Sequence, residues 1–213
     1  VHTAATDYEY RDVATGDYVR LADVIPVSIT GDNQTINASA LTMTLASTPV
    51  TSTVVKGASG VEALGVVFTA GDASAVKVTS IQARVYVSTT TFPVAAGTNE
   101  VTTPASNITT AKLYDGDTLL STKTLANTSG NATIAHDYGK VTFDGLNVAI
   151  PKSSNKKLTI KIDTNQTQSA EIFVAVSILG DEAVDSTADG NITAYDADSN
   201  TIDVTSNVNI LGA

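Results

Sequence analysis

The stretch from residue 111 to residue 163 constrains the fold more than any other part of the chain, because it contains three strand patterns in succession. The first pattern ends at Asp115-Gly116-Asp117, where Gly116 supplies the positive φ that a tight hairpin turn needs. Two later segments alternate apolar and polar residues, which is the period of a strand with one face in water. Their apolar positions are Val141 and Phe143, then Leu158, Ile160 and Ile162. This stretch predicts antiparallel β structure and gives no sign of catalysis.

Comparable strand patterns occur along the rest of the chain, and no segment has the period of an amphipathic helix. Turns rich in Gly, Asn, Asp and Ser separate them. The phase of alternation shifts near Thr79-Ser80, which predicts a β-bulge. The segment 172–178 is apolar on both faces, so we expect it in the middle of a sheet. The other expected strands lie at 24–29, 41–45, 63–70, 76–87, 192–195 and 201–204.

These patterns predict an all-β fold, an antiparallel β-sandwich of the immunoglobulin-like or jelly-roll-like kind. Residues 1–39 form an expected N-terminal extension that carries one strand, and residues 40–213 form the sandwich domain. The polar segment 89–110 is expected to be a long loop.

Charge and composition exclude several classes of partner. The chain of 213 residues has a net charge of −10, which argues against nucleic acid and anionic membrane surfaces. It has no cysteine, so disulfides and thiolate chemistry are excluded. No apolar run approaches the roughly 20 residues of a membrane span. The chain starts at Val1 without a methionine, as expected for a mature form after signal removal or for a fragment.

The N-terminal extension contains a candidate donor strand. Its apolar residues are Val24, Ile25, Val27 and Ile29. Pro26 lies inside the segment, and because proline has no N–H to donate, this strand is expected to pair on one side only. An isolated strand is not stable, so it must pair within its own domain or with the open edge of another subunit. Pairing with another subunit runs head to tail and builds a filament.

Seven N-x-S/T sequons predict covalent N-glycans. Each lies in or beside an expected loop or strand end, and their number exceeds what this composition gives by chance. The alternative is that turns rich in Asn, Ser and Thr create sequons by accident. The candidate acceptors are Asn33, Asn37, Asn107, Asn127, Asn131, Asn165 and Asn191.

Other chemical patterns are weaker. Asp196, Asp198, Asn200 and Asp203 have the opening spacing of a calcium loop but lack its glycine and its closing glutamate, so we favour a solvated acidic hairpin over calcium binding. No other cofactor is expected. The two histidines, His2 and His136, form no zinc or triad pattern. Lysine–asparagine isopeptide bonds are disfavoured, because the strand lysines alternate to the wet face.

The segment from Ala40 to Ile178 resembles a β-sandwich module of prokaryotic cell-surface proteins. The residues that carry the resemblance include Ala40-Leu41-Thr42-Met43-Thr44-Leu45, Val66-Val67-Phe68-Thr69-Ala70, Lys112-Leu113-Tyr114-Asp115-Gly116-Asp117 and Lys157-Leu158-Thr159-Ile160-Lys161. Such modules look like parts of S-layer and surface-fibre proteins. The short, sequon-rich, cysteine-free chain is also similar to archaeal thread and bundling-pilus subunits, which polymerise through donor strands. These modules usually recur in tandem, and this chain has one copy, which favours a small polymerising subunit.

The sequence therefore predicts a non-enzymatic, extracellular structural glycoprotein of the cell surface. We expect it to form a homopolymer, a filament or an S-layer-like sheet, by donating its N-terminal strand to a neighbour. The alternative is a carbohydrate-binding or adhesin module that uses the loop 89–110 or the acidic region 181–203. The lack of tryptophan counts against this alternative, because carbohydrate sites usually present exposed aromatic platforms.

Overall fold

The computed structural model describes residues 2–4, 11, 13–17, 28–32, 38–92, 99–130, 136–166, 171–180 and 191–204. The chain divides into two compact units, Val1–Asn37 and Ala38–Ala213, and each is described by itself. Sequence patterns had predicted a division between residues 39 and 40. No helix among the described residues is long and apolar enough to cross a membrane.

The N-terminal unit contains a short two-stranded ribbon. Strands β1 (His2–Ala4) and β2 (Ser28–Thr30) pair antiparallel, with Ile29 opposite Thr3. Of the candidate donor-strand residues, Ile29 thus lies in β2. Val24, Ile25 and Val27 lie outside the described residues. A ribbon of three-residue strands is too short to be stable alone in water.

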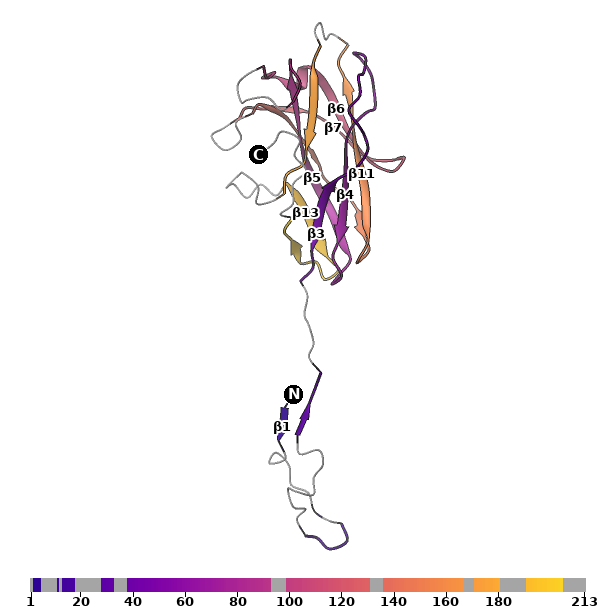
Figure 1. Ribbon diagram of the computed structural model, residues 1–213, viewed down its shortest axis with the longest axis vertical. Helices are drawn as coiled ribbons and strands as arrows, with labels where there is room; N and C mark the ends of the chain where they lie inside the picture. The colour runs from indigo at the N-terminus through magenta and orange to yellow at the C-terminus, as the bar shows by residue number, and fades with distance from the viewer. Residues whose placement is uncertain are drawn as a thin grey trace. The chain divides into compact units, whose positions relative to one another are not determined.

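The large unit is an antiparallel β-sandwich, which confirms the fold class predicted from the sequence (Figure 1). Its first sheet has five strands in the order β3-β4-β11-β6-β7. Strands β6 and β7 are joined by the tight turn that the sequence predicted, with Gly116 at φ 57°. The bounds are β3 Leu41–Leu45, β4 Val61–Ala70, β6 Ile108–Asp115, β7 Thr118–Thr124 and β11 Asn155–Thr164.

The second sheet is built around the long strand β5 (Val76–Ser88). Strands β9 and β10 pair with one side of β5, and β12 and β13 with the other; β8 and β14 extend the sheet beyond β9 and β13. A 3₁₀ helix, η3 (Pro104–Ser106), precedes β6. The remaining bounds are β8 Ala126–Thr128, β9 Tyr138–Phe143, β10 Val148–Ile150, β12 Phe173–Ser177, β13 Ile192–Asp196 and β14 Thr201–Ile202.

The core lies between the two sheets and is formed by the residues that alternate inward. The largest fully buried side chains come from both sheets and include Phe68, Phe143, Met43 and Ile160. Because the chain has no tryptophan and little aromatic content, β-branched and leucine side chains fill most of the remaining volume.

Two sequence expectations about strands have clear outcomes. The bulge near Thr79-Ser80 is confirmed, because the register between β13 and β5 skips Thr79. The expectation that segment 172–178 lies in the middle of a sheet is wrong for the described residues, since β12 pairs with β5 alone. Its second apolar face is explained by a small cluster on the outer surface, where Ala175 packs with Tyr86 and Tyr138.

Candidate assembly edge

Among the described residues, strand β4 of the first sheet is paired over only half its length on the side of β3. Strand β3 pairs with the second half of β4, from Val66 to Ala70. Ala46 donates one further hydrogen bond to the Gly65 carbonyl, and the chain then leaves the edge. Among the described residues, nothing pairs with β4 along this side between Val61 and Leu64. Leu45, which the sequence pattern placed on the buried face of its strand, is 60% exposed where β3 ends.

The chain between β3 and β4, residues 46–60, is called the crossing segment here, because it passes over the outer face of the sheet. Gly65 makes this passage possible. A Cβ added at Gly65 would lie far inside van der Waals distance of the Thr48 carbonyl oxygen and 3.0 Å from the Ala46 Cβ. Lys157 of β11 donates a hydrogen bond to the Thr48 hydroxyl on the same face. The crossing segment thus takes the chain away from the edge that a longer β3 would have covered.

Apolar side chains are exposed at the end of β3 and along the crossing segment. Six large apolar residues are exposed in the described part of the chain, and four of them lie between residues 45 and 55. These are Leu45, Val50, Val54 and Val55. A cluster of this kind, beside a half-paired strand, is typical of a surface that contacts another protein.

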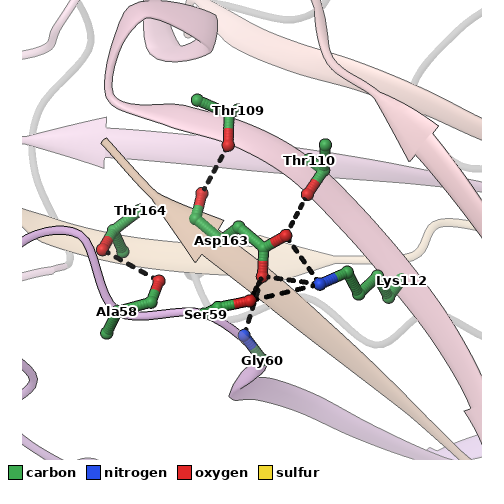
Figure 2. A network of polar contacts seen from close by, with 8 residues as sticks. All are labelled: Ala58, Ser59, Gly60, Thr109, Thr110, Lys112, Asp163 and Thr164. Atoms are coloured by element: carbon green, nitrogen blue, oxygen red, sulfur yellow. Dashed lines mark hydrogen bonds and ion pairs between the residues drawn. The ribbon is translucent and has the colours of Figure 1, made fainter. Parts of the chain in front are cut away.

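A polar network connects Ser59 and Gly60, at the C-terminal end of the crossing segment, to the sheet (Figure 2). The Asp163 carboxylate at the end of β11 lies at its centre. Lys112 Nζ of β6 lies 2.7 Å from Asp163 Oδ2, and Thr110 donates to the same oxygen at 2.5 Å. The Ser59 hydroxyl and the Gly60 N–H both donate to Oδ1 at 2.7 Å. The two residues at the end of the crossing segment are thereby joined to strands β6 and β11.

The electrostatics of the network are those of an ion pair. Partial burial alone raises the pKa of Asp163, but the hydrogen bonds from Lys112, Thr110, Ser59 and Gly60 outweigh it and hold that pKa well below its ordinary value. The Asp163 and Lys112 side chains are 19% and 21% exposed. No sequence pattern predicts this network, because its charged partners are 51 residues apart and both lie at outward positions of ordinary strands.

The candidate glycosylation sites differ in exposure. Asn127 lies in β8 and is exposed, and its side-chain oxygen accepts a hydrogen bond from Ala105. Asn165 is half-buried, with its amide donating to the Ser106 carbonyl. Asn107 and Asn191 are buried, so the folded domain does not present their amides to a modifying enzyme. Asn33, Asn37 and Asn131 lie outside the described residues.

Asn191 has a structural role within the second sheet. Its side-chain oxygen accepts a hydrogen bond from Gln82 at 2.7 Å, and its amide donates to the Gly180 carbonyl at 3.1 Å. These bonds tie the start of β13 to β5 and to the end of the segment that follows β12. These hydrogen bonds account for an asparagine at position 191 without a glycan.

The candidate calcium residues form a hydrogen-bonded turn between β13 and β14. Asp196 Oδ1 accepts hydrogen bonds from the backbone N–H groups of Asp198 and Asn200, and its Oδ2 accepts from the Asn200 amide. These bonds and the one from the Ser39 hydroxyl lower the pKa of Asp196. Asp203 is exposed beyond the turn. Within the described residues, no three His, Cys, Asp or Glu side chains gather closely enough to hold a metal.

A shallow hollow lies beside this turn on the outer face of the second sheet. Its volume is about 460 Å³, and Lys77, Thr79 and Tyr195 are among the residues that line it. Tyr195 and Lys77 are cross-strand neighbours in the register of β13 and β5. The hollow has a mainly apolar lining with one aromatic side chain, Tyr195, which is relevant to the carbohydrate-binding alternative.

His136 belongs to a packed aromatic group on the same sheet. It contacts the Glu100 carboxylate, and its ring meets the Tyr86 ring edge-on with centroids 6.1 Å apart. The buried Arg84 guanidinium lies 4.9 Å from the centre of the Tyr138 ring. Burial raises the pKa of Tyr86, although Arg84 and Ser177 beside it act in the opposite direction.

The fold and the half-paired edge define an antiparallel β-sandwich protein with a separate N-terminal unit. No family model matches the chain, and no curated protein matches it significantly.

Proposed function

We propose that this protein is a structural subunit of an extracellular filament or surface layer, assembled head to tail by strand donation from its N-terminal unit. The observation that carries the proposal is the combination of a small N-terminal unit with a sandwich whose side is half paired. Each copy then offers one strand-forming segment and one incomplete edge. Heterologous contacts between such surfaces produce open chains of subunits.

The chemistry of the two partners supports this assembly. The segment Val24–Ile29 is uncharged and has the alternation of a strand. Backbone hydrogen bonds along a sheet edge supply affinity in strand addition, and alternate side chains supply register. Covering an open edge also protects the protein from non-specific aggregation, which unpaired strand edges promote. No disulfide is present to stabilise the chain in another way.

Deletion of residues 1–30 is expected to abolish assembly and leave soluble monomers, because it removes the donated strand and keeps the sandwich intact. Negative-stain electron microscopy and sedimentation of the full-length and truncated proteins would measure this. Far-ultraviolet circular dichroism of the truncated protein provides the control for folding. Filaments that still form from the truncated protein would contradict strand donation.

The carbohydrate-binding alternative makes a different prediction for the same samples. It expects single particles from the full-length protein, together with glycan binding that substitution of Tyr195 abolishes. The hollow beside Tyr195 is the observation that favours it. The presence of only one aromatic side chain among the residues lining this hollow weighs against it.

Native material is expected to carry N-glycans at Asn127 rather than at Asn107 or Asn191. The transfer of a glycan needs an accessible amide, and only Asn127 of these three is exposed. Mass spectrometry of glycopeptides from the source organism would measure the occupancy of each sequon. Full occupancy at Asn191 would mean that modification precedes folding.

A further inference from the structure

Within the described residues, the half of β4 that has no β3 partner lies on the same side of the sandwich as β12, a strand that pairs with β5 alone. Strand β12 and strand β9 both pair with β5 at Arg84 and Val85, so they lie on opposite sides of β5. Strand β12 is therefore on the same side of the sheet as β13. The Ser39 hydroxyl, just before β3, donates to Asp196 at the end of β13, so this is also the β3 side of the sandwich. Strand β12 packs against β4 across the core.

These two edges border a seam in which the core is incompletely covered. Four apolar residues that pack against the core are only partly buried there. Two lie on the free half of β4, and two lie in or just before β12. They are Val61, Ala63, Ile172 and Val174.

The two edges differ in their protection against strand addition. The free half of β4 carries the charged Glu62, which forms an ion pair with Lys161 at 3.0 Å. Strand β12 has the sequence Phe-Val-Ala-Val-Ser, with no charge, proline or glycine. Natural edge strands usually carry such protective residues, so an unprotected edge of five residues is expected to have a partner. Among the described residues, β5 is its single partner strand.

We propose that β12 is the acceptor strand, and that residues 24–30 of a second copy of this chain pair with it and fill the seam. The inference rests on the proposed function and adds which edge is used and how the donor lies. Ile25, Val27 and Ile29 have the same parity, so they point together into the seam and cover the partly buried core. Pro26 has the opposite parity, so in an antiparallel pairing with β12 its missing N–H falls on the side away from β12.

The length of the donor segment agrees with the length of the seam. Residues 24–30 span about 23 Å as an extended strand, and the five residues of β12 span about 17 Å. The uncharged stretch between Asp23 and Asp32 is therefore long enough to pair along the whole of β12. Residues 28–30, the end of the donor segment, pair in this structure with the three residues of β1. A longer partner strand can replace so short a pairing.

The absence of native cysteines allows a direct test by disulfide cross-linking of the full-length chain. One variant carries Ile29→Cys, and a second carries Val174→Cys on β12. Equal amounts are mixed, assembled and oxidised. In the control mixture, Thr122→Cys takes the place of Val174→Cys. We expect the yield of mixed disulfide dimer to be roughly tenfold higher with Val174→Cys than in this control, because strand pairing raises the local concentration of the two thiols. Thr122 is exposed on β7, at the opposite edge of the first sheet.

The outcomes separate this inference from the proposed function. Assembly with cross-links to Thr122→Cys and none to Val174→Cys would overturn β12 as the acceptor and leave strand donation standing. A chain carrying both Ile29→Cys and Val174→Cys that closes its disulfide within monomers would overturn the second copy as the donor. No assembly and no cross-links, with normal circular dichroism, would overturn the proposed function as well.

Discussion

Replacing Gly65 with valine is expected to lower the free energy of unfolding by about 2–3 kcal/mol. The crossing segment lies directly over this glycine, and an added side chain would overlap the backbone carbonyl of Thr48 and approach Lys157 Cε within about 3.2 Å. A backbone carbonyl cannot rotate away as a side chain can, so the segment must lift from the sheet. Chemical denaturation in urea, followed by circular dichroism, would measure the loss.

A matched control is available six residues further along the chain. A Cβ added at Gly71 would meet Ala40 Cβ at 3.4 Å, which is an ordinary van der Waals contact. The same alanine substitution is therefore expected to lower stability much more at Gly65 than at Gly71. If the two variants unfolded at the same urea concentration, the close approach of the crossing segment to Gly65 would be disproved.

Much of this fold follows from local sequence patterns. The strand Leu41–Leu45, the turn at Gly116 and the bulge at Thr79 were each predicted, because each depends on the period of a few neighbouring residues. Strand β10 was not predicted, since Val148–Ile150 is too short to have a recognisable period. Within the segment 89–110, expected to be a loop, the chain forms η3 and begins β6 at Ile108.

The position of each strand within its sheet could not be predicted in the same way. The two apolar faces of β12 suggested an interior strand, but one of those faces packs in a local cluster with Tyr86. Burial of a face and pairing of an edge are separate properties, and a sequence pattern reports only the first. Leu45 shows the same limit, because its pattern continues although the chain departs from the sheet at Ala46.

The candidate assembly edge depends on contacts that are distant in sequence. Gly65 alone gives no sign that residues 46–48 pass over it, since a glycine in a strand can mark a bulge, a bend or a close approach. The edge becomes visible only when the pairings of β3, β4 and β12 are known together. The donor strand stays a prediction from local alternation, and of its residues the structure describes only Ile29, in β2.

Replacing Asp163 with alanine is expected to lower the free energy of unfolding by about 2–4 kcal/mol at neutral pH, because a half-buried Lys112 and several hydrogen-bond donors lose their common partner. Asp163→Asn should lose less, since its side-chain oxygen still accepts a hydrogen bond. Asp144→Asn is the matched control. Asp144 also pairs with a lysine, Lys123, but is 66% exposed, so its loss should have little effect.

The pH dependence identifies the ionised carboxylate as the cause. The folded-state pKa of Asp163 is lowered, so its contribution is complete above the unfolded pKa of about 4 and is lost as the pH falls toward the folded value. The stability difference between the native protein and Asp163→Asn should be constant from about pH 5 to 8 and shrink below about pH 4. A difference that stayed constant down to pH 2 would show that the network acts through packing rather than charge.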